Sequence, residues 1–196
     1  MTGGNHAGRG AAANIVLLGF MGCGKTTAAA KLAEIGGLEA VETDEIIARR
    51  AGMSIPEIFA REGEEGFRAR ETAVLREALA GRGRVISCGG GVVTRPENAA
   101  LLREAAAAGN CIVIRLTASP ETVFARIGAD PGRPMLKDVR GPEDIARLMA
   151  RREDAYRAAG GAEVVTDGRG AEEIAREILK IASDGAEDPD TAGEDG

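Results

Sequence analysis

The stretch GFMGCGKT, residues 19–26, decides the fold of this 196-residue chain. It matches the pattern G-x-x-x-x-G-K-[S/T], in which glycines let consecutive backbone N–H groups turn toward a bound phosphate. A short apolar run, NIVLL at residues 14–18, comes directly before it, and a helical pattern over residues 26–34 follows. A strand, a glycine loop and a helix in this order predict a phosphate-binding loop, because the helix N-terminus adds partial positive charge.

Two side chains of this loop have separate expected roles. The Lys25 ammonium would reach the β- and γ-phosphates of a nucleotide, and the Thr26 hydroxyl would bind Mg²⁺. The guanine-reading tetrapeptide Asn-Lys-x-Asp of GTPases does not occur in the sequence. A large ATPase motor needs a longer chain, so the length favours a small kinase.

Short apolar runs alternate with helical patterns along the rest of the chain. We expect strands over residues 14–18, 40–42, 84–87, 111–116 and 163–165. We expect helices over residues 26–34, 44–50, 64–79, 96–108, 119–127, 142–159 and 171–182, and a further helix opened by the capping box of Ser54 and Glu57. This alternation predicts an α/β protein of the P-loop NTPase type, a three-layer α/β/α arrangement around a five-stranded parallel sheet.

The composition favours one domain with an ordinary core. Hydrophobic residues make up 44% and charged residues 29%, which excludes chain-wide disorder, collagen and coiled coil. The small, polar residues 1–12 predict a flexible arm, and residues 184–196 predict a disordered acidic tail. Between them, residues 13–183 would form the domain. Its glycine- and proline-rich stretch at about 128–141 predicts a mobile lid loop.

The charge balance and the cysteines exclude several classes of function. The net charge is −6, but residues 184–196 hold six acids and no base, which leaves 25 acids and 25 bases in the remainder. A neutral body argues against a broad nucleic-acid surface, and no apolar run approaches the roughly 18 residues of a membrane span. Three cysteines without a CxxC pair favour free thiols and a reducing cytoplasm. With His6 as the one histidine, most histidine-based catalysis is excluded.

Two acidic residues follow the second expected strand. Glu42 and Asp44 are two positions apart, so they would leave an extended strand on the same side. Ligands of open α/β sheets sit at the carboxyl ends of the strands. One acid would hold Mg²⁺ or its waters and the other the accepting hydroxyl. A solvated strand end, or a helix N-cap at Asp44, is the simpler alternative.

Other candidate positions are weak when each is taken alone. Arg68 and Glu71 share a helix face at i, i+3, which a surface ion pair would also explain. The three glycines at residues 89–91 permit close backbone approach to a ligand, or form a plain turn. Arg133 lies in the expected lid, where an arginine would cover phosphates, and Arg152 lies in a later helix.

Together these segments resemble the shikimate kinase family from about Asn14 to Lys180. The matching stretches are GFMGCGKTT (19–27), ETDEIIARRAGMSIPEIFAREGEEGFRARE (42–71), VISCGGGVVTRPEN (85–98), GRPML (132–136) and LMARREDAY (148–156). The resemblance implies a nucleoside-monophosphate-kinase-like fold. It also implies transfer of the ATP γ-phosphoryl group to the 3-hydroxyl of shikimate, a step toward chorismate and the aromatic amino acids.

The resemblance also implies roles for individual residues. ATP would be bound by the phosphate loop and by three arginines: Gly22, Cys23, Gly24, Lys25, Thr26, Thr27, Arg126, Arg133 and Arg169. Shikimate would be bound by Asp44, Arg68, Glu71, Gly90 and Arg152. The reaction itself would depend on Lys25, Asp44 and Arg133, and Mg²⁺ would lie on Thr26 and Glu42. The expected partners are therefore ATP and shikimate, with neither nucleic acid nor membrane, and the expected state is a monomer.

The sequence departs from the family pattern at two places, and two other functions stay open. The family usually has Asp where this chain has Glu42, and it commonly has Pro-Leu-Tyr where this chain has Asp154-Ala155-Tyr156. A gluconate-type kinase of another small polyol acid is one alternative. A non-catalytic ATP-binding sensor is the other, and Glu42 is its only support.

Overall fold

The computed structural model describes residues 12–127 and 139–184. Residues 1–11 and 185–196 lie outside this description, so the predicted arm and acidic tail stay predictions. Residues 128–138 also lie outside it, and they include Arg133 and most of the predicted lid.

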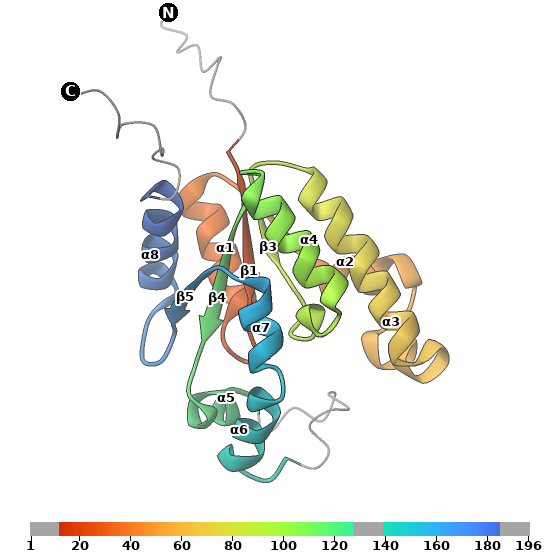
Figure 1. The fold of residues 1–196 in the computed structure, drawn as a ribbon. Helices are drawn as coiled ribbons and strands as arrows, with labels where there is room; N and C mark the ends of the chain where they lie inside the picture. The colour runs from red at the N-terminus through yellow and green to blue at the C-terminus, as the bar shows by residue number, and fades with distance from the viewer. Residues whose placement is uncertain (1–11, 128–138, 185–196) are drawn as a thin grey trace, which may run out of the picture.

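Five parallel strands form one sheet in the order β2-β3-β1-β4-β5 (Figure 1). The strands are β1 (Asn14–Leu18), β2 (Glu39–Glu42), β3 (Arg84–Ser87), β4 (Cys111–Thr117) and β5 (Ala162–Val165). The central β1 pairs with both β3 and β4, and Leu17 is in register with Ser87 on one side and Ile114 on the other. The predicted α/β fold with a five-stranded parallel sheet is confirmed.

The β1 strand is buried on both faces, which explains its unbroken apolar sequence. Ile15 and Leu17 belong to one core cluster, and Val16 and Leu18 to the other. Alternate residues therefore serve the two layers of helices, as the two-residue period of a strand requires.

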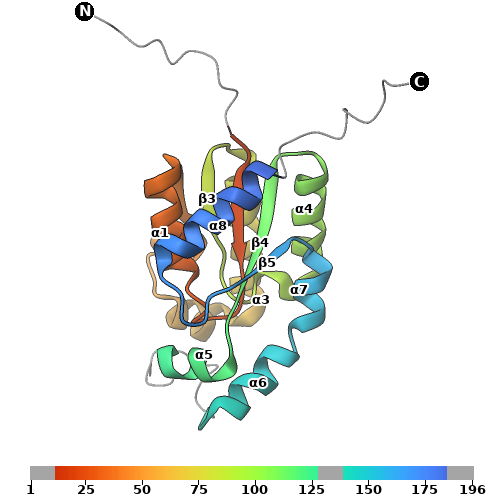
Figure 2. The same ribbon diagram turned by 90° about the vertical axis from the view of Figure 1, so that its left-hand side faces the viewer.

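Helices cover both faces of the sheet. In chain order the helical elements are α1 (Lys25–Gly36), α2 (Thr43–Ala51), α3 (Ile55–Ala80), the short 3₁₀ helix η1 (Val92–Thr94), α4 (Pro96–Ala107), α5 (Pro120–Ile127), α6 (Pro142–Ala150), α7 (Glu153–Ala159) and α8 (Ala171–Asp184). Helices α1 and α8 pack on one face, and α3, α4 and α7 pack on the other (Figures 1 and 2). Among the described residues, no helix is both long and apolar enough to cross a membrane.

One helical prediction is confirmed and another needs correction. The helices expected before and after residue 63 are both present in α3, where Gly63, with φ +70°, breaks the helical geometry between them. The single helix expected over residues 142–159 is two helices: α6 ends with Arg151 as its C-cap, and the N-cap of α7 is Arg152. Its side chain is buried against Gly90, a tertiary contact that helical periodicity cannot show.

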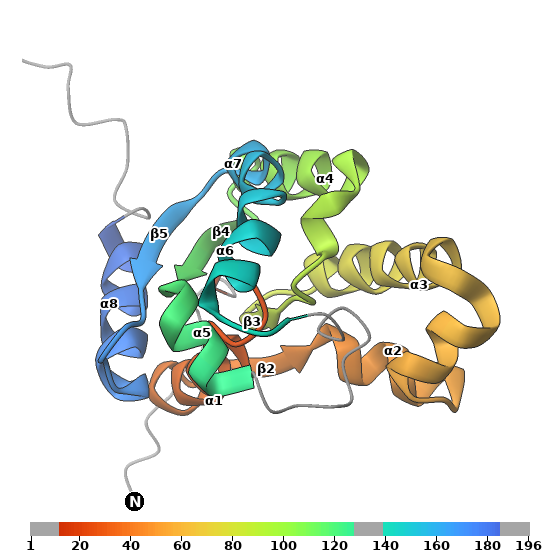
Figure 3. The same cartoon turned by 90° about the horizontal axis from the view of Figure 1, so that it is seen from below.

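The carboxyl ends of the strands meet at one edge of the sheet. Helices α5 and α6 lie beyond that edge (Figures 1 and 2), and in the view from below they lie in front of the strands (Figure 3). The phosphate loop, the β2–α2 junction and the loop after β3 all leave the sheet there. The topology therefore brings three of the predicted site segments to one place.

Candidate active site

The phosphate loop adopts a conformation that its glycines make possible. Gly19 has φ +140° and Gly24, the N-cap of α1, has φ +93°. A Cβ atom at Gly19 would lie 2.3 Å from the Leu116 carbonyl oxygen, so a side chain there would clash with the neighbouring strand. Any larger residue at this turn would have to displace backbone atoms.

The Lys25 side chain folds back over the loop. Its ammonium Nζ donates to the carbonyl oxygens of Gly19 at 2.8 Å and Phe20 at 3.1 Å. These two contacts hold a positive charge at the mouth of the loop, next to the helix N-terminus. The full positive charge of Lys25 and the partial positive charge of the α1 N-terminus therefore lie close together at the phosphate loop.

A possible cation site lies between Thr26 and Glu42. The Thr26 hydroxyl donates to Glu42 Oε2 at 3.3 Å. The second oxygen, Glu42 Oε1, is buried and has no hydrogen-bond partner among the described residues. Burial raises the pKa of Glu42, although hydrogen bonds from Ser87 and Thr26 oppose the shift. A carboxylate oxygen with no hydrogen-bond partner, next to a hydroxyl, provides oxygen ligands that suit Mg²⁺.

No cluster of three or more His, Cys, Asp or Glu side chains with metal-binding geometry occurs in residues 12–127 and 139–184. Mg²⁺ at phosphate sites does not need such a cluster, because one or two protein oxygens share it with phosphates and waters. Thr26 and Glu42 therefore fit the ion that the sequence predicted, with glutamate in place of the usual aspartate.

Asp44 lies in the site, but on a different element from the one expected. It lies in the first turn of α2, not on an extended strand, so the argument from strand alternation was wrong. The buried Thr43 fixes this junction, since its hydroxyl donates to the Ser87 carbonyl at 3.2 Å and accepts from the Gly89 N–H at 3.1 Å. The helix start thus carries Asp44 to the loop after β3.

One cavity of about 320 Å³ joins these segments. Its lining comes from the phosphate loop, the start of α1, the β2–α2 junction, the loop after β3 and the end of α5. The lining residues are Met21, Gly22, Gly24, Lys25, Thr26, Thr27, Glu42, Asp44, Ser87, Cys88, Gly89, Gly90, Arg126 and Ile127. Lys25 and Asp44 therefore face one volume. Cys23 does not line it, because its side chain is buried beneath the loop.

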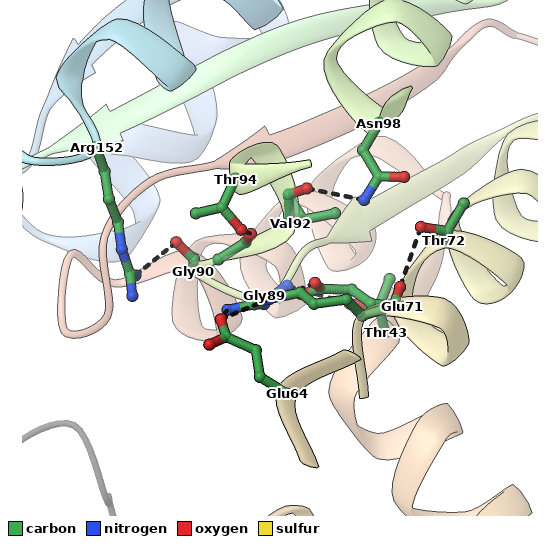
Figure 4. A network of polar contacts seen from close by, with 12 residues as sticks. Thr43, Glu64, Glu71, Thr72, Gly89, Gly90, Val92, Thr94, Asn98 and Arg152 are labelled. Atoms are coloured by element: carbon green, nitrogen blue, oxygen red, sulfur yellow. Dashed lines mark hydrogen bonds and ion pairs between the residues drawn. The ribbon is translucent and has the colours of Figure 1, made fainter. Parts of the chain in front are cut away.

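Gly89 and Gly90 form a wall of this cavity, and Gly91 follows them. Figure 4 shows Gly89 and Gly90 among the polar contacts of this region. A Cβ at Gly89 would lie 2.7 Å from both Asp44 Oδ1 and Glu71 Oε1. A Cβ at Gly91 would lie 2.4 Å from Arg68 Nη1. The absence of side chains here lets charged groups from α2 and α3 approach the loop backbone.

Arg68 and Glu71 form a buried ion pair behind that wall. Their side chains are 2.8 Å apart, and the residues are only 6% and 1% exposed. Burial raises the pKa of Glu71 to about 7, although the Arg68 charge opposes the shift. Burial disfavours the charge on Arg68, but Glu71 and Glu64 raise its pKa above the ordinary value. The simpler prediction of a surface ion pair is wrong.

Arg152 approaches the same wall from the opposite side (Figure 4). Its Nη1 donates to the Gly90 carbonyl oxygen at 3.0 Å, and its Cζ lies 5.4 Å from the centroid of the Phe20 ring. Two buried arginines, Arg68 and Arg152, thus flank the glycine segment. Asp154, the departure in this region, is exposed on α7.

The structure separates the two arginines predicted for the adenine side. Arg126 lines the cavity, and its Nη1 donates to the Gly22 carbonyl at 3.1 Å. Arg169 instead pairs with Glu173 and Glu177 on α8 and donates to the Val165 carbonyl. It is not among the residues that line the cavity.

Sequence reasoning missed the buried threonines that support the site. Thr166 donates from its hydroxyl to the Cys23 carbonyl at 3.1 Å and accepts from Arg126 Nη1 at 3.3 Å. Thr43 plays the corresponding part at the β2–α2 junction. A threonine directly after an expected strand was the only available signal, and it is too common to stand out.

The fold and this cavity define the class of P-loop kinases that act on small molecules. The chain belongs to the shikimate kinase family, whose family model matches residues 21–183. It is 46% identical over 165 residues to the shikimate kinase of Moorella thermoacetica, covering 84% of this chain and 91% of that one. It is 44% identical over 165 residues to that of Geobacter sulfurreducens, covering 84% and 88%.

A solved structure gives the same assignment. Shikimate kinase from Acinetobacter baumannii in complex with shikimate superposes with a TM-score of 0.82 at 34% sequence identity. The comparison covers 90% of this chain and 96% of that one. The resemblance drawn from the sequence motifs is confirmed.

Proposed function

We propose that this protein transfers the γ-phosphoryl group of ATP to the 3-hydroxyl of shikimate, giving shikimate 3-phosphate and ADP. The observation that carries the proposal is the single cavity that Lys25 and Asp44 both line, with buried Arg68 and Arg152 behind its glycine wall. Phosphoryl transfer depends mainly on positioning and charge neutralisation, and this cavity supplies both. The product would enter the route to chorismate and the aromatic amino acids.

On the nucleotide side, the loop from Gly22 to Thr27 holds the phosphates through backbone N–H groups. Lys25 exchanges its carbonyl contacts for the β- and γ-phosphate oxygens, where its charge offsets the negative charge of the transferring group. Arg126 supports the loop from α5 at the adenine side. Arg133, outside the described residues, stays a prediction as a lid arginine. Arg169 would have to leave Glu173 and Glu177 to contact the nucleotide.

On the acceptor side, Asp44 accepts a hydrogen bond from the acceptor hydroxyl and orients that oxygen toward the γ-phosphorus. Arg68 and Arg152 bind the carboxylate, a task that suits planar guanidinium groups. Glu71 keeps the Arg68 guanidinium in place, and the Gly90 backbone contacts a ring hydroxyl. Asp44 also stands where a general base would stand.

The Thr26 hydroxyl and the Glu42 carboxylate would hold Mg²⁺. The ion would neutralise phosphate charge on ATP. Glu42 is one methylene longer than aspartate, and its buried, unpartnered Oε1 supports its use as a ligand or as an acceptor for a metal-bound water.

We also propose that the protein is a cytoplasmic monomer. Its three cysteines are buried and free, which suits a reducing compartment. Ile35 and Val165 are the large hydrophobic side chains exposed in the described part of the chain. Light scattering of the purified protein tests the oligomeric state.

A coupled ADP-release assay with three reactions tests the function. The acceptor is shikimate, gluconate or absent. ADP release only with shikimate supports the proposal. Release with gluconate at a comparable kcat/KM identifies a kinase of another polyol acid, and ATP binding without acceptor-dependent release identifies a sensor.

A further inference from the structure

Tyr156 meets the acceptor wall of the cavity through a buried hydroxyl. The residue is 3% exposed, and its hydroxyl lies 2.7 Å from the Gly90 carbonyl oxygen. A carbonyl oxygen only accepts, so the phenol must donate. Burial raises the pKa of Tyr156, so the phenol keeps the proton that this hydrogen bond needs.

The Tyr156 ring is fixed from its own helix and from the sheet. The Arg115 Cζ lies 4.9 Å from the ring centroid, a cation–π contact. Arg115 in turn pairs with Glu153 of α7, with Nη1 2.9 Å from Oε1. The hydroxyl therefore has little freedom to leave the Gly90 carbonyl.

Gly90 lies between the phosphate loop and Arg152. A Cβ on this residue would lie 3.1 Å from the Met21 backbone nitrogen, so its backbone packs against the phosphate loop. The same Gly90 oxygen also accepts from Arg152 at 3.0 Å. The Tyr156 hydroxyl is therefore a second donor to the Gly90 carbonyl, and it holds the Gly90 peptide in place whether or not Arg152 also contacts a carboxylate.

We propose that Tyr156 is a positioning residue for the acceptor, holding the Gly90 backbone in place while Arg152 binds the carboxylate. This inference rests on the proposed function. It assigns no chemical step to Tyr156, because the hydroxyl faces the Gly90 carbonyl and is not among the groups that line the cavity.

The test compares KM values for both substrates in the wild type, Tyr156→Phe and Asn14→Ala. We expect Tyr156→Phe to raise the shikimate KM about three- to tenfold, as loss of one neutral hydrogen bond allows. The ATP KM and kcat should change less than about twofold, because the phosphate loop keeps its own supports.

Asn14→Ala is the matched control. Asn14 is also buried, and it lies at the start of β1, at the end of the strand away from the phosphate loop. Its side chain donates to the Gly81 carbonyl at 2.7 Å and accepts from the Arg84 N–H at 3.1 Å. Its loss should lower Tm and leave both KM values unchanged. Equal KM values for wild type and Tyr156→Phe would overturn the inference, as would a parallel rise for both substrates.

A second measurement does not depend on the variant folding. Tyr156 is the one tyrosine of the chain, so replacing tyrosine biosynthetically with 3-fluorotyrosine gives a single ¹⁹F resonance. Shikimate should shift this resonance, and gluconate should not. A resonance unmoved at saturating shikimate overturns the inference, whereas a wild type that does not phosphorylate shikimate overturns the proposed function and the inference with it.

Discussion

At the scale of single residues, the acceptor side of the cavity depends on charges that are removed from water. Arg68 is buried with Glu71, so its guanidinium is already desolvated and oriented before any ligand arrives. Preorganised charges of this kind bind a carboxylate more strongly than mobile surface charges.

Arg68→Ala should raise the shikimate KM about 10- to 100-fold, since a hydrogen bond to a charged group is worth about 1.5–3 kcal/mol. The ATP KM should barely change, because Arg68 does not contact the phosphate loop. Steady-state kinetics with each substrate varied in turn measures both. Arg68→Lys keeps the charge for Glu71 and serves as the control for folding; equal damage to both KM values would refute the assignment.

Lys25→Met should abolish turnover, because it removes the full positive charge at the phosphate loop. The fold should survive, since the carbonyl contacts of Lys25 stay within its own loop. ADP release and circular dichroism measure the two effects. Lys31→Met, a half-buried position on α1 that pairs with Glu34, should keep wild-type turnover, and comparable turnover in both variants would contradict the role of Lys25.

At the scale of elements, the site is built from the segments that follow β1, β2 and β3. Buried threonines hold two of these segments, the β2–α2 junction and the phosphate loop, in place. Thr43 joins the start of α2 to the loop after β3, and Thr166 joins the end of β5 to the phosphate loop. These contacts hold the segments at the carboxyl ends of the strands together and so fix the distances between their functional groups.

Thr166→Val should raise the ATP KM about two- to tenfold, because it removes the hydrogen bond to the Cys23 carbonyl and one acceptor for Arg126. The shikimate KM should change little. Thr72→Val is the comparison, since its buried hydroxyl bonds the Arg68 carbonyl within α3. An unchanged ATP KM in Thr166→Val would mean that the loop holds its shape without β5.

The elements that the sequence predicted best are those whose signal is local. The phosphate loop, its strand and its helix are contiguous, so the sequence of residues 14–36 is sufficient to predict all three. The pairing of Arg169 with Glu173 and Glu177 was not readable in this way, because Arg169 precedes α8 and meets the two glutamates of the helix through the turn after β5.

Contacts between distant segments were not predictable in the same way. The Tyr156 hydroxyl and its Gly90 acceptor are 66 residues apart, and Thr166 and its Cys23 acceptor are 143 residues apart. Nothing in either local pattern marks these partners. The break between α6 and α7 belongs here too, since Arg152 at that break contacts Gly90, which is 62 residues away in the sequence.

At the scale of the whole molecule, placing Glu71 in the core makes stability depend on pH. Burial raises its pKa from an ordinary 4.5 to about 7, so the folded state holds a proton that the unfolded chain releases between these values. The contribution to stability is complete below about pH 4.5 and is lost as the pH rises through about 7.

The free energy of unfolding should therefore fall between pH 5 and pH 8 more steeply in the wild type than in Glu71→Gln. Urea denaturation at several pH values measures the difference. Glu104→Gln, an exposed change on α4, should follow the wild-type curve. Parallel curves for wild type and Glu71→Gln would contradict the burial-driven shift.

The proposed function requires that one cavity hold both substrates at once. A crystal structure with shikimate and a non-hydrolysable ATP analogue is the decisive measurement. We expect the triphosphate in the loop of residues 19–26, the shikimate carboxylate against Arg68 and Arg152, and the 3-hydroxyl between Asp44 and the γ-phosphorus. Shikimate bound outside this cavity, with Arg68 and Arg152 making no contact to its carboxylate, would refute the proposed function.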